Sequence, residues 1–408
     1  MLFARIYFPL ALGYAISYFY RNANAILEGD LVIELGLGPA DLGLLTSVYF
    51  ISFAAFQLPL GFLLDRYGPR RTESILLLFA ALGSVLFAQA ESLSGLIVGR
   101  LLIGLGVSAC LMAAFKAYVL WFSSERLAMI NGLQMVAGGL GALGATIPLQ
   151  NALSYTDWRG VFTGLAFITV FASICLWVFL PENQKIDEKL PTLKLQFKET
   201  GQVLRSHIFW GIAPLAAISS GTNMAIHGLW IKPWLRDVAG LSAVNSAQLL
   251  FAMTLTLIGG FLTLGIIAER LSQFFDVRPI SISVFGMTIY LFVQSTMIYG
   301  GIGSPLILVI LLGFFGTASI LVYAGYAQIF PKNLSGRVST ILNLLVFIVA
   351  FLLQWGIGAI LEMWPATDNG YEPESYQAAI GVLVLLQATG LIWYLFSKKL
   401  FRKQSVLI

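Results

Sequence analysis

The sequence predicts an all-α integral membrane protein with twelve transmembrane helices. The chain has 408 residues, of which 58% are hydrophobic and only 11% charged, whereas a soluble domain carries about a quarter charged residues. Apolar runs of roughly 20 residues recur along the chain, which is the length of a helix that crosses a bilayer. These runs are continuously apolar rather than alternating in segments of about ten residues, which excludes a membrane β-barrel.

The twelve predicted helices follow the apolar runs in order. The first run ends at Arg21, Asn22 and Asn24 without a small-residue cleavage site, so we expect a retained helix and not a signal peptide. The predicted helices are 5–27, 41–64, 73–90, 94–117, 127–150, 159–180, 207–230, 243–267, 278–299, 304–327, 337–361 and 376–397.

Positive charge predicts the orientation of these helices. With the N-terminus inside the cell, cytoplasmic segments hold 19 of the 24 lysines and arginines. Because cytoplasmic loops of membrane proteins are enriched in Lys and Arg, both termini are expected in the cytoplasm. The net charge of +4 belongs to these loops, and membrane lipids rather than nucleic acid are the expected surroundings.

A long polar interruption divides the chain into equal parts. It covers residues 183–206 and separates a predicted N-terminal six-helix bundle at 1–182 from a C-terminal one at 207–408. Gly61-x3-Asp65-Arg66 after the second helix recurs as Gly265-x3-Glu269-Arg270 after the eighth. Parallel repeats of six helices, with a substrate site where the repeats meet, are one architecture of secondary transporters.

The most specific motif lies between the second and third predicted helices. It reads Gly61-Phe62-Leu63-Leu64-Asp65-Arg66-Tyr67-Gly68-Pro69-Arg70-Arg71, and Gly68 with Pro69 suits a tight turn. This segment resembles the signature loop of the major facilitator superfamily. The resemblance implies a gating role for Gly61, Asp65, Arg66, Gly68, Arg70 and Arg71, and the two-bundle fold of that family.

Arg100 in the fourth helix belongs to a second stretch that resembles the family, Arg100-Leu101-Leu102-Ile103-Gly104-Leu105-Gly106. An arginine within a span costs about 2.5–3.5 kcal/mol on insertion scales, so it is expected to face the bundle and be paired. Bonding to carbonyl groups of a neighbouring helix and a role in coupling remain equal alternatives, and Arg100 is grouped with the gating residues of the turn. The glycine-rich run Gly138–Pro148 in the fifth helix predicts close helix packing with a proline kink.

Other segments narrow the resemblance. Asp157-Trp158-Arg159 resembles a common feature of the superfamily. The segment 228–237 at the end of helix seven is similar to a bacterial branch loosely related to organic-anion and nitrate/nitrite porters, which implies the inner membrane of a bacterium. Nitrate porters carry arginines within helices two and eight, and this chain has none in the middle of either. The resemblance therefore favours organic anions over nitrate.

A polar stripe on the first helix predicts the substrate site. Tyr14, Tyr18, Arg21, Asn24 and Glu28 are spaced by three or four residues and share one helix face. The guanidinium of Arg21 offers a planar fork of donors for a carboxylate or phosphate; an internal ion pair with an acid is the alternative.

Further polar positions within the spans complete the candidate binding set. Lys116 either extends to the cytoplasmic surface or supplies a second cation to the substrate path. Amides within membrane spans more often join helices than bind ligands. The amide candidates are Asn131, Gln134, Asn223 and Asn343.

Few groups are expected to carry protons. Carboxylates are almost absent from the middle of the spans, and the usual buried aspartate relay is not visible. Coupling would therefore use His227, Glu28 or Asp30, or the protein would exchange one anion for another. The two cysteines fall within spans. No Walker loop, zinc spacing or nucleophile elbow is present, so neither a cofactor, a metal nor enzymatic catalysis is predicted.

The sequence thus predicts a monomeric secondary transporter, specifically a symporter or exchanger that imports a small organic anion. Efflux of a siderophore or amphipathic drug is the second hypothesis, which directional flux in inside-out vesicles would separate from import. A membrane sensor or scaffold without transport is the third, although such proteins usually carry an appended soluble domain.

Overall fold

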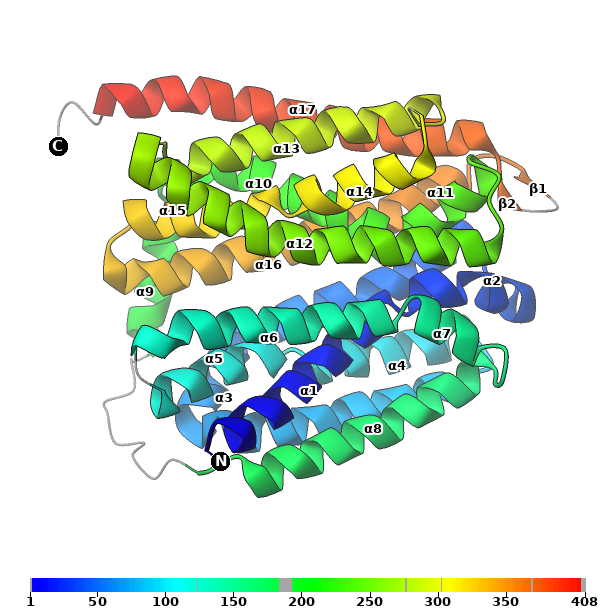
Figure 1. Ribbon diagram of the computed structural model, residues 1–408, viewed down its shortest axis with the longest axis horizontal. Helices are drawn as coiled ribbons and strands as arrows, with labels where there is room; N and C mark the ends of the chain where they lie inside the picture. The colour runs from blue at the N-terminus through cyan, green and yellow to red at the C-terminus, as the bar shows by residue number, and fades with distance from the viewer. Residues whose placement is uncertain are drawn as a thin grey trace. The chain divides into compact units, whose positions relative to one another are not determined.

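The computed structural model describes residues 2–122, 124–182, 193–275, 277–301, 303–367 and 370–404 (Figure 1). The described chain is almost entirely helical, and every one of the twelve predicted spans falls on helix. Ten helices in this part of the chain are long and apolar enough to cross a membrane. The predicted all-α membrane fold is therefore confirmed.

The chain divides into two compact units. The first comprises Met1–Leu190 with Ala243–Phe251, and the second Pro191–Ser242 with Ala252–Ile408. The first unit holds α1 (Leu2–Asn22), α2 (Asn24–Leu35), α3 (Pro39–Ala88), α4 (Leu93–Gly106), α5 (Cys110–Trp121), α6 (Ser124–Gly144), α7 (Ile147–Ala152) and α8 (Trp158–Phe179).

The long helices of the second unit follow one another in the same order as those of the first, and one short helix precedes them. It contains α9 (Leu193–Leu204), α10 (His207–Ala225), a π-helical turn η1 (Ile226–Trp230), α11 (Ile231–Asp237), α13 (Pro279–Thr296), η2 (Met297–Tyr299), α14 (Pro305–Gly316), η3 (Ala318–Ile320), α15 (Leu321–Ile329), α16 (Lys332–Leu361) and α17 (Pro373–Gln404). The helix α12 (Ala243–Phe275) begins in residues assigned to the first unit. An antiparallel pair of two-residue strands, β1 (Ala366–Thr367) and β2 (Gly370–Tyr371), joins α16 to α17.

The turn between the second and third predicted spans lies inside α3. Gly68 has φ 76° and ψ 167°, a left-handed conformation that glycine adopts without steric cost. The Thr72 hydroxyl donates to the carbonyl of Leu63 across this turn at 3.2 Å, which shows that the chain folds back there. The tight turn predicted from Gly68 and Pro69 is present.

Among the described residues, four of the interrupted spans occupy equivalent places in the two halves. The first span of each half breaks between α1 and α2 and at η1, and the fourth breaks between α4 and α5 and at η3. Side chains bind the carbonyls that such breaks release: Ser108 donates to Leu105 at 2.7 Å, and Thr317 donates to Phe314 at 2.8 Å. The repeat seen weakly in the sequence is thus also visible in the backbone.

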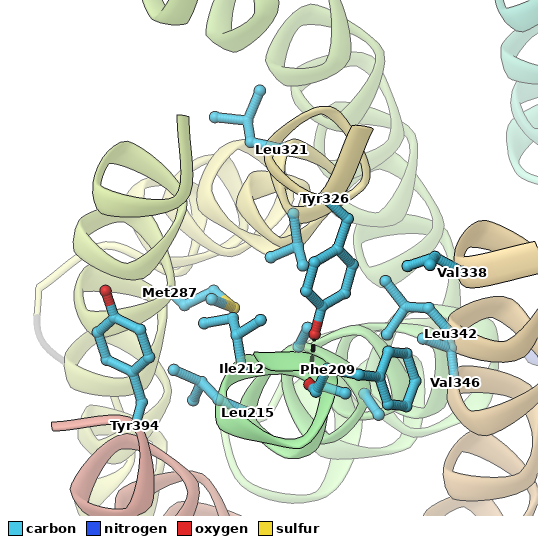
Figure 2. Packing of buried hydrophobic residues seen from close by; sticks show 14 of the residues in the cluster. Phe209, Ile212, Leu215, Met287, Leu321, Tyr326, Val338, Leu342, Val346 and Tyr394 are labelled. Atoms are coloured by element: carbon cyan, nitrogen blue, oxygen red, sulfur yellow. Dashed lines mark hydrogen bonds between the residues drawn. The ribbon is translucent and has the colours of Figure 1, made fainter. Parts of the chain in front are cut away.

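Each unit has its own apolar core. In the second unit, Figure 2 shows Phe209, Ile212 and Leu215 of α10 packed with residues of α13, α15, α16 and α17. The hydroxyl of Tyr326 donates to the carbonyl of Phe209 at 2.5 Å within this core. A smaller cluster in the first unit consists of Leu60, Leu64, Leu76, Ala109 and Ala113.

Candidate functional site

Aromatic rings surround the guanidinium of Arg21 in the first unit. Its central carbon lies 4.6 Å from the ring centre of Tyr18 on α1, and 5.7 Å and 5.6 Å from those of Tyr49 and Phe53 on α3. Rings at this distance attract a cation through their negative faces. Arg21 is partly exposed. The arrangement presents a fixed positive charge in an aromatic setting.

Hydroxyl groups lie beside this charge. The Tyr14 hydroxyl donates to that of Tyr18 at 3.3 Å, and the hydroxyls of Ser17 and Tyr49 are also 3.3 Å apart. Ser17 lies on α1 and Tyr49 on α3, so the pair joins the two helices that hold Arg21. Donors and acceptors of this kind suit the hydroxyl groups of a polar organic ligand.

The glycine-rich face of α6 positions the stripe on α1. A Cβ atom at Gly138 would lie 2.5 Å from the Tyr14 ring and 3.1 Å from that of Tyr18, and one at Gly141 would lie 1.9 Å from the carbonyl oxygen of Ala15. The two helices therefore approach at a distance that only glycine permits. The predicted packing role of this run is what the structure shows, and the helix break that accompanies it falls between α6 and α7.

Arg100 is fully buried in the same unit. Its Nη1 donates to the carbonyl of Tyr20 at 2.6 Å, and its guanidinium lies 5.8 Å from the ring centres of Tyr49 and Phe87. Tyr20 precedes the α1–α2 junction, where helical hydrogen bonding is incomplete. Of the two interpretations from the sequence, bonding to a neighbouring helix agrees with this geometry.

Lys116 does not join the Arg21 cluster. Its Nζ forms an ion pair with Asp65 of the α3 turn, so the expected second free cation is instead neutralised. The two residues are 51 positions apart in the chain, and only the packing of α5 against the turn brings them together. The role of Lys116 in substrate binding stays a prediction, and it would require this pair to separate.

The remaining motif residues also have structural partners. Arg70 and Arg71 both pair with Glu182 just after α8, while Arg66 lies over the rings of Phe62 and Tyr67 at 5.8 Å and 5.5 Å. Gly61 is exposed, with nothing within 4 Å of the place where a Cβ would be. These ion pairs join the turn to α5 and to the chain just after α8, all within the first unit, and the gating role remains a prediction.

The amides of the first unit are mainly occupied in joining helices. Gln134 accepts from the Tyr118 hydroxyl at 2.7 Å and donates to the Leu10 carbonyl at 3.2 Å, which leaves little capacity for a ligand. Asn24 donates to Thr46 at 3.0 Å. Asn131 is half-buried, and its Oδ1 has no hydrogen-bond partner among the described residues.

The polar candidates of the second unit lie around interrupted helices. His227 is in the π-helical turn η1, a feature frequent at functional sites, and its Nε2 is 2.9 Å from the Thr254 hydroxyl. Asn223 is buried against Gly316, where a Cβ would lie 2.3 Å from Oδ1. Asn343 accepts from Tyr323 at 3.4 Å.

The acids predicted for proton coupling differ in burial. Glu28 on α2 is 2% exposed, whereas Asp30 is exposed and lines a pocket of about 550 Å³ with Glu34, Gln150 and Trp158. Glu34 is held there by Trp158, whose Nε1 donates at 2.6 Å, and by Arg159. The described part of the chain contains no group of three His, Cys, Asp or Glu side chains that could hold a metal ion.

Glu73 is a buried carboxylate that was not among the candidates from the sequence. Glu73 lies on α3 five residues after Gly68 and is 0% exposed. In the sequence it follows Arg70 and Arg71 and resembles part of a solvated charged turn. The available signal for its burial was its place at the start of the apolar run 73–90. A side chain in the first turn of such a helix can face the bundle interior. Tyr49 and Phe53, which belong to an ordinary apolar run, carried no such signal.

These features define a polytopic helical transporter: repeated bundles, interrupted spans and a cation among hydroxyl groups. The family model of the Major Facilitator Superfamily matches residues 10–353, and the chain belongs to that family. Its fold is that of a bacterial homolog of the human lysosomal transporter Spinster, with a TM-score of 0.79 at 16% identity over 98% of both chains.

Characterised relatives are similar over part of their length. The chain is 25% identical to the hexuronate transporter of Escherichia coli (strain K12) over 278 residues, 62% of this chain and 63% of that protein. It thus spans less than two thirds of that relative. It is also 34% identical to the nitrate/nitrite transporter NrtP of Picosynechococcus sp. (strain ATCC 27264 / PCC 7002 / PR-6) over 112 residues, 28% of this chain and 20% of that protein. The protein is therefore a multi-pass membrane transporter of the superfamily.

Proposed function

We propose that the protein imports a small organic anion across the inner membrane by alternating access, coupled to protons or to exchange, with Arg21 as the residue that binds the anionic group. The observation that carries the proposal is the guanidinium of the half-buried Arg21 among the rings of Tyr18, Tyr49 and Phe53. A planar fork of donors matches a carboxylate. The aromatic faces hold that fork in place, so less side-chain entropy is lost when the anion binds.

The substrate class that fits best is a hydroxylated carboxylate. The hydroxyls of Tyr14, Ser17 and Tyr18 lie on α1 with Arg21, and that of Tyr49 lies on α3. They complement a ligand that carries hydroxyl groups beside its carboxylate. The hexuronate transporter among the relatives is named for a molecule of this class. Nitrate, which has no hydroxyl groups, would leave these groups unused.

Uptake into proteoliposomes tests the proposal. A thermal-shift screen with hexuronates, other carboxylates, phosphates, amino acids and siderophores first identifies a ligand, because a ligand that binds only the folded state raises its stability. Arg21→Gln is then expected to lower uptake by about a hundredfold, the effect of losing a charge-assisted contact of 1.5–3 kcal/mol or slightly more. Arg5→Gln is the matched control, since Arg5 donates to the Phe179 carbonyl on the surface. Equal uptake by the two variants would contradict the assignment, and net export from right-side-out vesicles would contradict import.

The proposed orientation places both termini in the cytoplasm. A fluorescent protein that folds only in the cytoplasm, fused after Ile408, is expected to be fluorescent, and alkaline phosphatase fused at the same place is expected to be inactive. The opposite pattern would refute the topology inferred from the charge distribution.

A further inference from the structure

Glu73 has an enclosed carboxyl group that the proposed anion site does not use. The side chain is 0% exposed and projects from α3 toward α1, where a Cβ at Gly13 would lie 2.6 Å from its Oε1. Helix α1 therefore contacts the carboxyl group only because residue 13 has no side chain. The same helix carries Arg21, so the carboxyl group packs directly against the element that bears the proposed anion site.

The surroundings of Glu73 suit the neutral acid. Neither carboxyl oxygen receives a hydrogen bond from a nitrogen or oxygen donor in the part of the chain that the structure describes. The thiol of Cys110, at the break between α4 and α5, lies beside it. Moving an ionised carboxylate from water into a site that offers it no hydrogen-bond donors costs several kcal/mol. Burial of the neutral, protonated carboxyl group beside a thiol and a methylene group costs much less free energy.

The ionisable groups on the facing helices connect Glu73 to the anion site. From α5, Cys110 and Tyr118 are within electrostatic range of the carboxyl group. From α1, Arg21 acts electrostatically on Cys110, whose thiol lies beside the Glu73 carboxyl group. Cys110 is therefore a neighbour that Glu73 and Arg21 share.

The charged groups of its own helix are occupied elsewhere. Arg70 and Arg71 precede Glu73 by one turn or less, and both pair with Glu182. Arg70 also lies over the Trp177 ring at 5.3 Å. In the described part of the chain, neither arginine forms an ion pair or hydrogen bond with the Glu73 carboxyl group, so its own turn supplies no cationic partner.

A metal cation does not fit this site. Hard cations bind several oxygen ligands at once, and the described residues contain no group of three acidic, histidine or cysteine side chains. The environment of Glu73 offers one thiol and one backbone methylene. The proton is the cation that a single enclosed carboxyl group can bind.

We propose that Glu73 is the proton-binding residue that couples anion transport to the proton gradient, an inference that rests on the proposed function. The Glu73 carboxylate takes up one proton and becomes the neutral acid, and an anion of charge −1 binds at Arg21. The proton and the anion together carry no net charge, so their joint transport moves no net charge across the membrane. On the other side the O–H bond of Glu73 breaks, the proton passes to water and the anion leaves. Because bound anion offsets the charge of Arg21, it favours protonated Glu73, and by linkage the proton favours the anion equally.

Infrared spectroscopy of the purified protein tests the protonation of Glu73 without any substrate. The wild type at pH 7 is expected to show a carboxylic-acid C=O band that Glu73→Gln lacks. Glu91→Gln, which alters an exposed acid in the loop between α3 and α4 of the same unit, is expected to keep it. Glu73→Asp, which restores an acid at this position, should recover the band. Identical carboxylic-acid bands in wild type and Glu73→Gln would overturn the proposal.

Transport in proteoliposomes tests the coupling, with glucuronate as the probe. Glu73→Gln is expected to lose accumulation driven by a pH gradient by about tenfold or more, the size of a typical coupling, while it retains exchange of glucuronate for glucuronate. Gradient-driven accumulation at the wild-type level in this variant would overturn the proposal. If the wild type moves no glucuronate, the proposed substrate class fails, and the infrared result still decides whether Glu73 binds the proton.

Discussion

The two halves of the molecule enclose different chemistry within the same arrangement of helices. The first unit buries Glu73 and Arg100 inside its spans, with Arg21 partly exposed nearby. The second unit instead buries Lys232 and His227 near its interrupted first span, together with a neutral pair in which Gln387 donates to Gln294 at 2.5 Å. Repetition of a fold thus fixes where helices pack and break, while the polar groups inside each half are free to diverge.

The contact between the first and fifth helices of each half shows the same freedom. In the first unit the glycines lie on the fifth helix, where Gly141 of α6 approaches Ala15. In the second unit the glycine lies on the first helix of the half, where Gly221 of α10 approaches Val349 and Ala350 of α16. Close approach needs one small residue, and either partner can supply it.

A third pair of contacts joins the first and sixth helices of each half. Glu34 near the end of α2 accepts from Trp158, the first residue of α8, at 2.6 Å. Asp237 at the end of α11 accepts from Tyr376, in the first turn of α17, at 2.7 Å, and from the Tyr371 amide at 3.1 Å. An acid is used in both places, but Asp237 is 2% exposed and Glu34 45%.

The largest effect is expected from glycine substitutions. Gly141→Ala should destabilise the protein by about 3 kcal/mol or more, because its methyl group would overlap a backbone carbonyl that cannot move aside. Gly221→Ala should cost less, about 1–2 kcal/mol, because its nearest contact is the Val349 Cγ1 methyl at 2.9 Å, which can shift, while the Ala350 backbone nitrogen lies at 3.0 Å. Thermal unfolding in detergent measures both, with Gly132→Ala on α6 as the control because nothing lies within 4 Å of that Cβ. Equal unfolding temperatures for Gly141→Ala and Gly132→Ala would show that α1 and α6 do not pack this closely.

The acids at the ends of the first helices should differ in importance. Tyr376→Phe is expected to cost about 1.5–3 kcal/mol, because it removes a hydrogen bond to a buried carboxylate. Glu34→Ala should cost about 1 kcal/mol or less, since exposed ion pairs contribute little. Unfolding temperatures again provide the comparison, and a larger loss for Glu34→Ala would reverse the inferred order of burial.

The buried amide pair should be replaceable as a unit. Gln387→Leu alone is expected to cost about 1–3 kcal/mol because the Gln294 amide is left without its partner, whereas Gln294→Leu with Gln387→Leu should be nearly neutral. A double-mutant cycle on unfolding free energies isolates the pair. Transport should survive in the double variant; its loss would assign function to a pair interpreted here as structural.

The smallest effect on stability is expected for the ion pair of the α3 turn. Lys116 and Asp65 are 29% and 36% exposed, so solvent screens their attraction and Lys116→Met should change stability by about 1 kcal/mol or less. Any difference from the wild type should shrink in high salt. A loss of several kcal/mol, insensitive to salt, would show that the pair is shielded from water.

The sequence alone determined the properties that depend on local composition. The length of the apolar runs fixes helices and membrane spans because lipid cannot hydrogen-bond the backbone. Gly68 with Pro69 fixed the turn, and the glycine run on the fifth helix predicted its close packing. The stripe of Tyr14, Tyr18 and Arg21 also followed from helical spacing.

Only the tertiary structure decided which polar groups meet. Tyr49 and Phe53 reach Arg21 from another helix, and Lys116 meets Asp65 from 51 residues away. Glu73 reads as part of a charged turn in the sequence, yet the fold encloses it against Gly13. The physical reason is that spacing along a helix fixes the face on which a side chain lies, while the burial and pairing of a charge depend on neighbouring helices that are distant in the chain.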